Sequence, residues 1–437
     1  MSEVAAESAA PAPEELGSWR ILVRSFATLM SGETAARLFG LLGVLVLARR
    51  LGPSDFGIIS FALSLIGWFA LVVDSGTELL NVRDIAREPH RFREIAERVL
   101  GLRLAISIVA SGLFVLGVEL LANSSRVRDT VVLFAIVLPA TAINLRWMVL
   151  GVRAVKAIAV GNIAARAVLA IGIVILVHGG GDLHTVPFLE AAAETVYGIV
   201  IIGAVTRHFG VTRPRIDLAA WTQTLRQSTP LLVNAFARAA FYSFDIVAIE
   251  LLLGPGKVGI YTAASKPVLF LTSALGIFSV SFLSSFSAAK GDAARWLLRR
   301  TMWTSFAVCL PLGVALSAGS ILIVPAVFGQ RYHSAAGVLA ILAWRVPVVA
   351  LASPLGSALV ASGRQRTLMR NNVLGALLLA AADIAAIPLV GILGAAGVSV
   401  AASAFVSVLN YRAAREQTGY QGGSTPRSFR RHGRSPA

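Results

Sequence analysis

The sequence predicts an all-α polytopic membrane protein with about twelve transmembrane helices in two pseudo-symmetric halves of about six helices each. The first observation behind this prediction is composition: the 437 residues are 56% hydrophobic and 14% charged, with a mean hydropathy of +0.75. A soluble domain cannot bury that much apolar surface. The second observation is the length of the apolar runs, and the third is an internal repeat.

The apolar runs are long enough to cross a bilayer, because about 20 helical residues span its hydrocarbon core. The last two runs are separated only by the segment around Gly391 and Gly394, which predicts a tight hairpin. The predicted spans are 21–48, 56–75, 98–121, 130–150, 157–177, 185–206, 228–252, 258–284, 299–325, 335–361, 371–390 and 393–411.

More polar segments flank and divide these spans. Residues 1–19, rich in Ala, Glu and Pro, predict a disordered cytoplasmic tail, and residues 412–437 predict a basic cytoplasmic tail. A linker at 207–227 mixes apolar and basic side chains, which predicts an interfacial helix. The linker divides a first half at 20–206 from a second half at 228–411.

Arginine and lysine are concentrated in every second connection between the spans. Because positive residues gather on the cytoplasmic side of a membrane, this bias predicts that both termini are cytoplasmic, which requires an even number of spans. The same bias accounts for the formal net charge of +16 without any nucleic acid partner. The connections that are rich in Arg and Lys lie within 83–98, 153–156, 207–226, 290–300 and 364–370.

A short motif occurs twice in the chain. The tripeptide Leu-Gly-Pro occupies 51–53 and 253–255, and Gly57 and Gly259 follow it at the same spacing, so the offset between the copies is 202 positions. Each copy ends one long span and opens the next. Parallel repeats related by an axis along the membrane normal are found in alternating-access carriers, where the substrate site lies between the halves.

The residues around this motif resemble a known family. The segments are ARRLGPSDFGIISFALSLI, DSG at 74–76, VRDIAR at 82–87, DIVAIELLLGPGKVGIYTAASK, and VFGQRYHSAAGVLAILAW at 327–344. They are similar to bacterial polysaccharide or oligosaccharide (O-antigen-type) flippases of the multidrug/oligosaccharidyl-lipid/polysaccharide exporter superfamily. The resemblance implies a multi-pass protein of the bacterial cytoplasmic (inner) membrane that carries undecaprenyl-pyrophosphate-linked glycans to the periplasmic leaflet.

Basic side chains inside the predicted spans are the main candidates for function. A cation at the centre of a transmembrane helix costs roughly 2.5–3.5 kcal/mol on insertion scales, so a set spread over several spans predicts a shared polar cavity for an anionic substrate. The candidate cavity residues are Arg37, Arg166, Arg238, Lys266 and Arg345. Three further arginines lie within about two turns of the cytoplasmic edge, where we expect them to snorkel: Arg24, Arg103 and Arg146.

Acidic side chains accompany these cations. Glu33 lies four positions before Arg37, a spacing that predicts either a structural pair or a contribution to the cavity. Asp245 follows Arg238 by seven positions on the same helix face. Neutralisation of the cations or coupling to H⁺ or Na⁺ would each explain such a set. Its members are Glu33, Asp74, Asp245, Glu190 and Glu194.

The sequence therefore favours a flippase for undecaprenyl-pyrophosphate-linked oligosaccharide that works by alternating access, without a cofactor, metal or catalytic residue. Its partners would be the lipid-linked glycan, membrane lipids, and a glycan polymerase or glycosyltransferases, with no nucleic acid. A multidrug/cation antiporter of the same fold would need an acidic cavity, and the excess of Arg and Lys argues against it. A membrane enzyme of glycan assembly would need acid–base or metal-binding groups, and the histidines show no metal-ligand spacing.

The predicted orientation can be tested by thiol labelling in intact cells, after replacement of Cys309, the single cysteine. Cysteines introduced at Arg126 or Lys257 should react with an impermeant thiol reagent added outside, because they lie on the side that is poor in positive charge. Cysteines at Arg91 or Arg295 should be protected. The opposite labelling pattern would contradict both the orientation and the number of spans.

Overall fold

The computed structural model describes residues 13–122, 124–151, 155–210, 213–280, 286–287, 289 and 291–420, and these residues form helices without any strand. The predicted tails fall largely outside this range, although α1 begins within the first of them. The longer helices are α1 (Pro13–Asp74), α2 (Thr77–Arg87), α3 (Phe92–Leu121), α4 (Ser125–Leu133), α5 (Val137–Ala142), α6 (Arg146–Gly151), α7 (Val155–Leu176), α8 (Thr185–Phe209), α9 (Leu218–Leu253), α10 (Pro255–Val280), α12 (Gly291–Ala318), α13 (Ser320–Phe328), α14 (Ala335–Leu342), α15 (Arg345–Ala361), α16 (Gln365–Val390) and α17 (Ile392–Tyr420).

The prediction of a polytopic membrane protein is confirmed. Within the described residues, ten helical stretches are long and apolar enough to cross a membrane. One of them, Ala36–Asp74, holds the second predicted span and part of the first, which are joined at a kink where Gly52 adopts φ 79° and ψ 176°. The seventh predicted span lies within α9, which is not one of the ten. The number twelve and the symmetry of the halves remain predictions.

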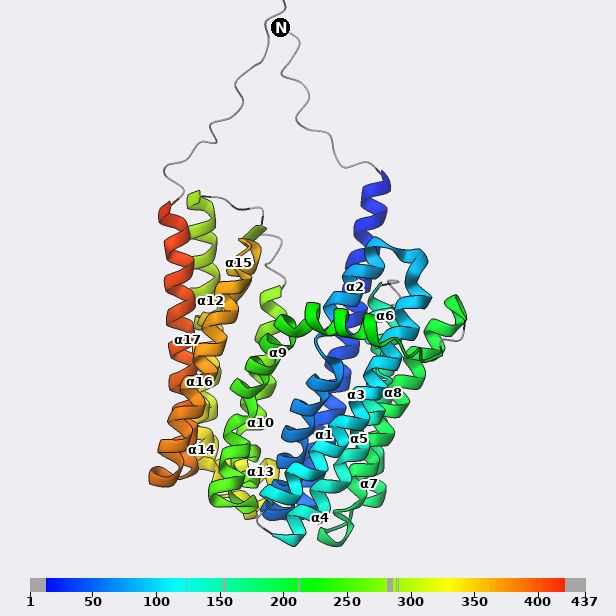
Figure 1. Cartoon of the computed structure of the whole chain (residues 1–437). Coiled ribbons are helices and arrows are strands. Elements are labelled where there is room, and N and C mark those ends of the chain that lie inside the picture. The colour runs from blue at the N-terminus through cyan, green and yellow to red at the C-terminus, as the bar shows by residue number, and fades with distance from the viewer. Residues whose placement is uncertain are drawn as a thin grey trace, which may run out of the picture.

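The long helices form two groups that follow the order of the chain. Figure 1 shows α1 to α8, coloured from blue to green, beside α9 to α17, coloured from green to red. The groups lie close together at the end that carries α4 and α13, and apart at the opposite end. We call the first of these the joined end. Helix α1 packs against α9 and α10, so these three helices form the boundary between the groups.

The two copies of the repeated motif pack against each other at the joined end. A Cβ atom added to Gly57 would overlap the carbonyl group of Pro255, and one added to Gly259 would overlap the carbonyl group of Pro53. The contact is reciprocal, because each glycine meets the proline of the other copy. Only a residue without a side chain allows two backbones to approach this closely.

Further contacts across the joined end involve the end of α13 and the segment that follows it. The buried hydroxyl of Tyr332 donates a hydrogen bond of 2.8 Å to the backbone oxygen of Ala48. Arg49 donates from Nε to the backbone oxygen of Val327 at 2.8 Å and from Nη2 to that of Ala326. The phenylalanine and tyrosine of the FGQRY segment, Phe328 and Tyr332, are both buried. This part of the family-like sequence therefore fastens the second group to α1.

The start of α9 lies against the first group. The indole Nε1 of Trp221 donates to the backbone oxygen of Arg98 at 3.1 Å, and the amide of Arg215 donates to that of Glu97 at 2.9 Å. Figure 1 shows the first turns of α9 running across the long helices before the chain turns along them. Pro230 lies inside α9 and leaves one backbone carbonyl without its helical donor. That this segment lies in the membrane interface remains a prediction.

Alanine substitutions can test the close approach of the repeats. Gly→Ala in a helix normally stabilises it by roughly 0.5–1 kcal/mol, but Gly57→Ala and Gly259→Ala should instead destabilise the protein by about 1–3 kcal/mol, because the new methyl group meets a backbone carbonyl. Gly112→Ala and Gly117→Ala are matched controls, since a Cβ at either position would have no neighbour within 4 Å. Thermal unfolding of the purified protein in detergent measures the difference, and equal midpoints for both pairs would contradict the close contact.

Candidate functional site

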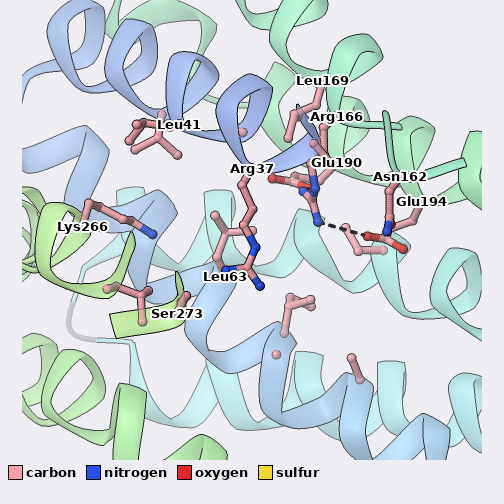
Figure 2. A pocket seen from close by; sticks show the side chains of 18 of the residues that line it. Arg37, Leu41, Leu63, Asn162, Arg166, Leu169, Glu190, Glu194, Lys266 and Ser273 are labelled. Carbon is pink, nitrogen blue, oxygen red and sulfur yellow. Dashed lines mark ion pairs between the residues drawn. The ribbon is translucent and has the colours of Figure 1, made fainter. Parts of the chain in front are cut away.

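A cavity of about 580 Å³ lies between helices of both groups. Its polar lining comes from α1, α5, α7, α8 and α10, and Figure 2 shows most of these side chains. The apolar lining includes Leu41, Val44, Leu63, Leu169 and Phe270. The polar lining consists of Arg37, Thr141, Asn162, Arg166, Glu190, Glu194, Lys266 and Ser273.

The structure brings three of the five predicted cavity cations together here: Arg37 from α1, Arg166 from α7 and Lys266 from α10. Glu190 and Glu194, one helical turn apart on α8, face Arg166, with one carboxylate oxygen of each 3.9 Å from a guanidinium nitrogen. The predicted shared face of these two glutamates is therefore present. The two carboxylates neutralise Arg166, and Figure 2 marks the ion pair with Glu194.

The cavity carries more positive than negative charge. Among the described lining residues there are three cations and two acids, and both acids lie beside Arg166. Arg37 and Lys266 come from opposite groups and extend into the same space in Figure 2. The side chain of Glu33, the predicted partner of Arg37, lies outside the described residues. An anion placed between Arg37 and Lys266 would contact both groups at once.

Arg238 lines a different cavity of about 320 Å³ within the second group. Its walls come from α9, α10, α15, α16 and α17, and α10 contributes Thr272 here and Ser273 to the first cavity. Arg37 and Arg238, which were both predicted to line one shared cavity, therefore line two different cavities.

Arg345 is buried inside the second group. Its Nη1 donates to the hydroxyl of Ser399 at 3.1 Å, and its guanidinium lies 5.0 Å from the ring centre of Tyr242 and 5.6 Å from that of Phe241. A guanidinium over an aromatic face gains a cation–π attraction. These contacts account for part of the guanidinium, because its buried Nε and Nη2 have no hydrogen-bond partner among the described residues.

Asp245, which the sequence places on the same helix face as Arg238, has other hydrogen-bond partners in the structure. The carboxylate of Asp245 accepts hydrogen bonds from the hydroxyl of Tyr261 and from the backbone amide of Ile246, the latter at 3.0 Å. The two helices that hold Asp245 and Tyr261 meet at the second Leu-Gly-Pro motif, which brings the two side chains together. Asp383, which the sequence did not single out as a site residue, is fully buried nearby, with neither carboxylate oxygen hydrogen-bonded to a described residue.

Arg103 corrects another expectation. We expected it to snorkel toward the membrane edge, but it is only 3% exposed and forms an ion pair with Asp74. Its Nη1 also donates to the backbone oxygen of Asn144 at 2.7 Å. Arg146 is exposed, with its Nε 3.8 Å from Glu78, and the side chain of Arg24 lies outside the described residues. Asp74 is thus a partner in a structural pair and does not line the cavity.

Three neutral polar residues of the cavity were missed: Thr141, Asn162 and Ser273. Helical spacing could have found two of them, because Asn162 precedes Arg166 by four positions and Ser273 follows Lys266 by seven. Among the described residues, no three His, Cys, Asp or Glu side chains gather closely enough to hold a metal ion. The site therefore offers cationic and neutral hydrogen-bond donors, which suit an anionic or hydroxyl-rich ligand.

The family model described as "Polysaccharide biosynthesis protein" matches residues 22–286, and the chain belongs to this family. A protein of Escherichia coli (strain K12), provisionally described as an O-antigen transporter, is 22% identical over 225 residues. The matched region is 50% of this chain and 54% of that protein, so the match spans about half of each.

Solved structures of membrane transporters share the fold. The lipid II flippase MurJ, in an inward closed conformation, matches with a TM-score of 0.74 at 13% identity, over 89% of this chain and 87% of that chain. An inward-facing multidrug resistance MATE family transporter of the MOP superfamily matches with a TM-score of 0.70 at 13% identity, over 88% and 94%. At 13% identity these matches show that the chain shares the fold of these transporters. The predicted relationship to polysaccharide biosynthesis proteins is confirmed by the family match over residues 22–286.

The cluster around Arg166 can be tested by a double-mutant cycle. Arg166→Gln should destabilise the protein, because it leaves two neighbouring carboxylates without their cation. Adding Glu194→Gln should restore part of the loss, and we expect a coupling free energy on the order of 1 kcal/mol. Thermal unfolding of the four purified proteins gives this quantity. Additive effects would show that the two residues do not interact.

Proposed function

We propose that this protein is a flippase that moves undecaprenyl-pyrophosphate-linked oligosaccharide across the bacterial cytoplasmic membrane. The observation that carries the proposal is the net positive cavity between the two groups, with Arg37 and Lys266 on opposite sides. Family membership in polysaccharide biosynthesis supports the substrate class, and the fold shared with the lipid II flippase supports lipid-linked transport.

A pyrophosphate fits this cavity by charge and by hydrogen bonding. Arg37 offers a planar fork of donors that matches phosphate oxygens, and Lys266 offers a compact point charge. Asn162, Thr141 and Ser273 can hydrogen-bond sugar hydroxyls in the same space. The isoprenoid chain would remain in the lipid, because placing it among these polar groups would desolvate them without compensation.

Transport by alternating access requires the joined end to open. The contacts that would break are the paired Leu-Gly-Pro motifs, the hydrogen bond from Tyr332 to Ala48, and those from Arg49. An anion bound between Arg37 and Lys266 would draw the two groups together at the cavity. Substrate binding would thereby favour separation at the joined end, which is the differential affinity that a ligand needs to shift a conformational equilibrium.

The charge of the cavity argues against the two alternatives. A carrier of cationic drugs would need acids that are available to the drug, and both acids among the described lining residues face Arg166. A membrane enzyme would need a nucleophile or an acid–base pair at the cavity, and the described lining shows only cations, the two paired glutamates and neutral groups. A glycan polymerase and glycosyltransferases remain proposed partners, since they would supply and consume the lipid-linked glycan.

Substitution of the two facing cations tests the proposed role. Arg37→Gln and Lys266→Gln should each reduce transport of a lipid-linked oligosaccharide in liposomes at least tenfold at equal protein abundance, because each removes a charge from the anion site. Arg37→Lys should recover only part of the activity, since it keeps the charge but loses the fork. Arg238→Gln, in the other cavity, is the matched control and should retain transport.

Wild-type transport by both Arg37→Gln and Lys266→Gln would contradict the cationic site. Loss of folded protein would instead indicate a structural role for these residues. Membrane abundance and size-exclusion profiles must therefore be measured beside transport.

A further inference from the structure

A second polar pocket, of about 280 Å³, lies away from the central cavity. It is formed by α2, the start of α3 and the first turns of α9, and it shares no residue with the central cavity. The VRDIAR segment singled out in the sequence contributes two of its arginines. The pocket is lined by Leu80, Asn81, Arg83, Asp84, Arg87, Glu88, Arg91, Ile95, Arg98, Gln223, Thr224 and Gln227.

The acids of this pocket already have cationic partners. Asp84 lies 2.9 Å from Arg83, and Glu88 lies 2.9 Å from Arg91. Arg87 and Arg98 form no ion pair with a described residue, so the lining carries two arginines in excess of its acids. Such an excess attracts an anion from the surrounding water or from the membrane surface.

Two buried donors in the pocket lack an acceptor in the described structure. The side chain of Asn81 is 1% exposed, and its Nδ2 has no hydrogen-bond partner. The Nε of Arg98 is buried and also without a partner. A buried donor left unsatisfied costs about 1–3 kcal/mol, so donors of this kind are normally matched by an acceptor.

We propose that this pocket binds a phosphate group, held by Arg87, Arg98 and the side-chain amide of Asn81. A phosphate presents several strong acceptor oxygens and a negative charge, which match both the unpartnered donors and the excess of arginine. Gln223 and Gln227 from α9 complete the wall with neutral donors. The volume admits a phosphate or pyrophosphate, or the phosphate of a lipid headgroup.

Binding here would fasten the start of α9 to the first group. The wall residues of α2 and α3 belong to that group, while α9 continues through Pro230 into the second group. The start of α2 and helix α9 already lie close together, because a Cβ added to Gly76 would come within 2.7 Å of the backbone nitrogen of Leu232. A bound phosphate would therefore strengthen the connection between the groups at the end opposite to the Leu-Gly-Pro contact.

Phosphate binding to the full-length protein tests the proposal. The protein is purified in detergent, and inorganic phosphate and pyrophosphate are titrated by calorimetry at constant ionic strength, with thermal unfolding as a second readout. Arg87→Gln, an exposed position that should not affect folding, and Asn81→Leu should each weaken binding at least tenfold. Arg93→Gln is the matched control, because Arg93 is exposed on α3, outside the pocket, and pairs with Glu97.

A second arm identifies the source of the phosphate. Protein in nanodiscs of zwitterionic lipid, with or without phosphatidylglycerol, is analysed by native mass spectrometry for retained anionic lipid. Saturable binding of free phosphate, or retention of phosphatidylglycerol, supports the proposal if Arg87→Gln abolishes it and Arg93→Gln does not. The proposal is overturned if wild-type protein binds in neither arm. An equal loss of binding in Arg93→Gln also overturns it. So does a loss of binding in Lys266→Gln while Arg87→Gln binds as well as the wild type.

Discussion

A charged side chain inside a membrane protein must find a partner, a hydrogen bond or water, and this requirement arranges much of the interior. Arg103 pairs with Asp74 and Arg166 with two glutamates. Arg345 donates one hydrogen bond to Ser399 and lies against two aromatic rings, while its Nε and Nη2 have no partner among the described residues. Each of these contacts joins different helices: α1 with α3, α7 with α8, and α15 with α9 and α17. Arg37 and Lys266, by contrast, line the cavity between the two groups.

Hydropathy predicts how deep a side chain lies in the membrane, but it does not predict which neighbouring helix the side chain faces. Hydropathy therefore located Arg37, Arg166 and Lys266 within spans, and the structure brings them into one cavity. The same reasoning grouped Arg238 and Arg345 with them. Their helices turn these side chains into the second group, away from the boundary.

Side-chain neighbours were predictable from the sequence only where both residues lie on one helix. The face shared by Glu190 and Glu194 follows from their spacing, and the structure has it. The pair of Arg103 with Asp74 depends on how α3 packs beside the end of α1, which helical periodicity does not contain. The kink at Gly52 and the two spans that it joins were predictable, because Leu-Gly-Pro interrupts an apolar run.

The reciprocal contact of Gly57 and Gly259 resembles one feature of an isologous interface, in which each partner presents the same kind of residue to the other. Two molecules of a smaller membrane protein carrying one Leu-Gly-Pro motif could dimerise through it. Gene duplication and fusion of such a unit would keep the contact intact. Once fused, the two copies would be free to diverge everywhere except at these glycines, where a change in either one is resisted by the backbone of the other.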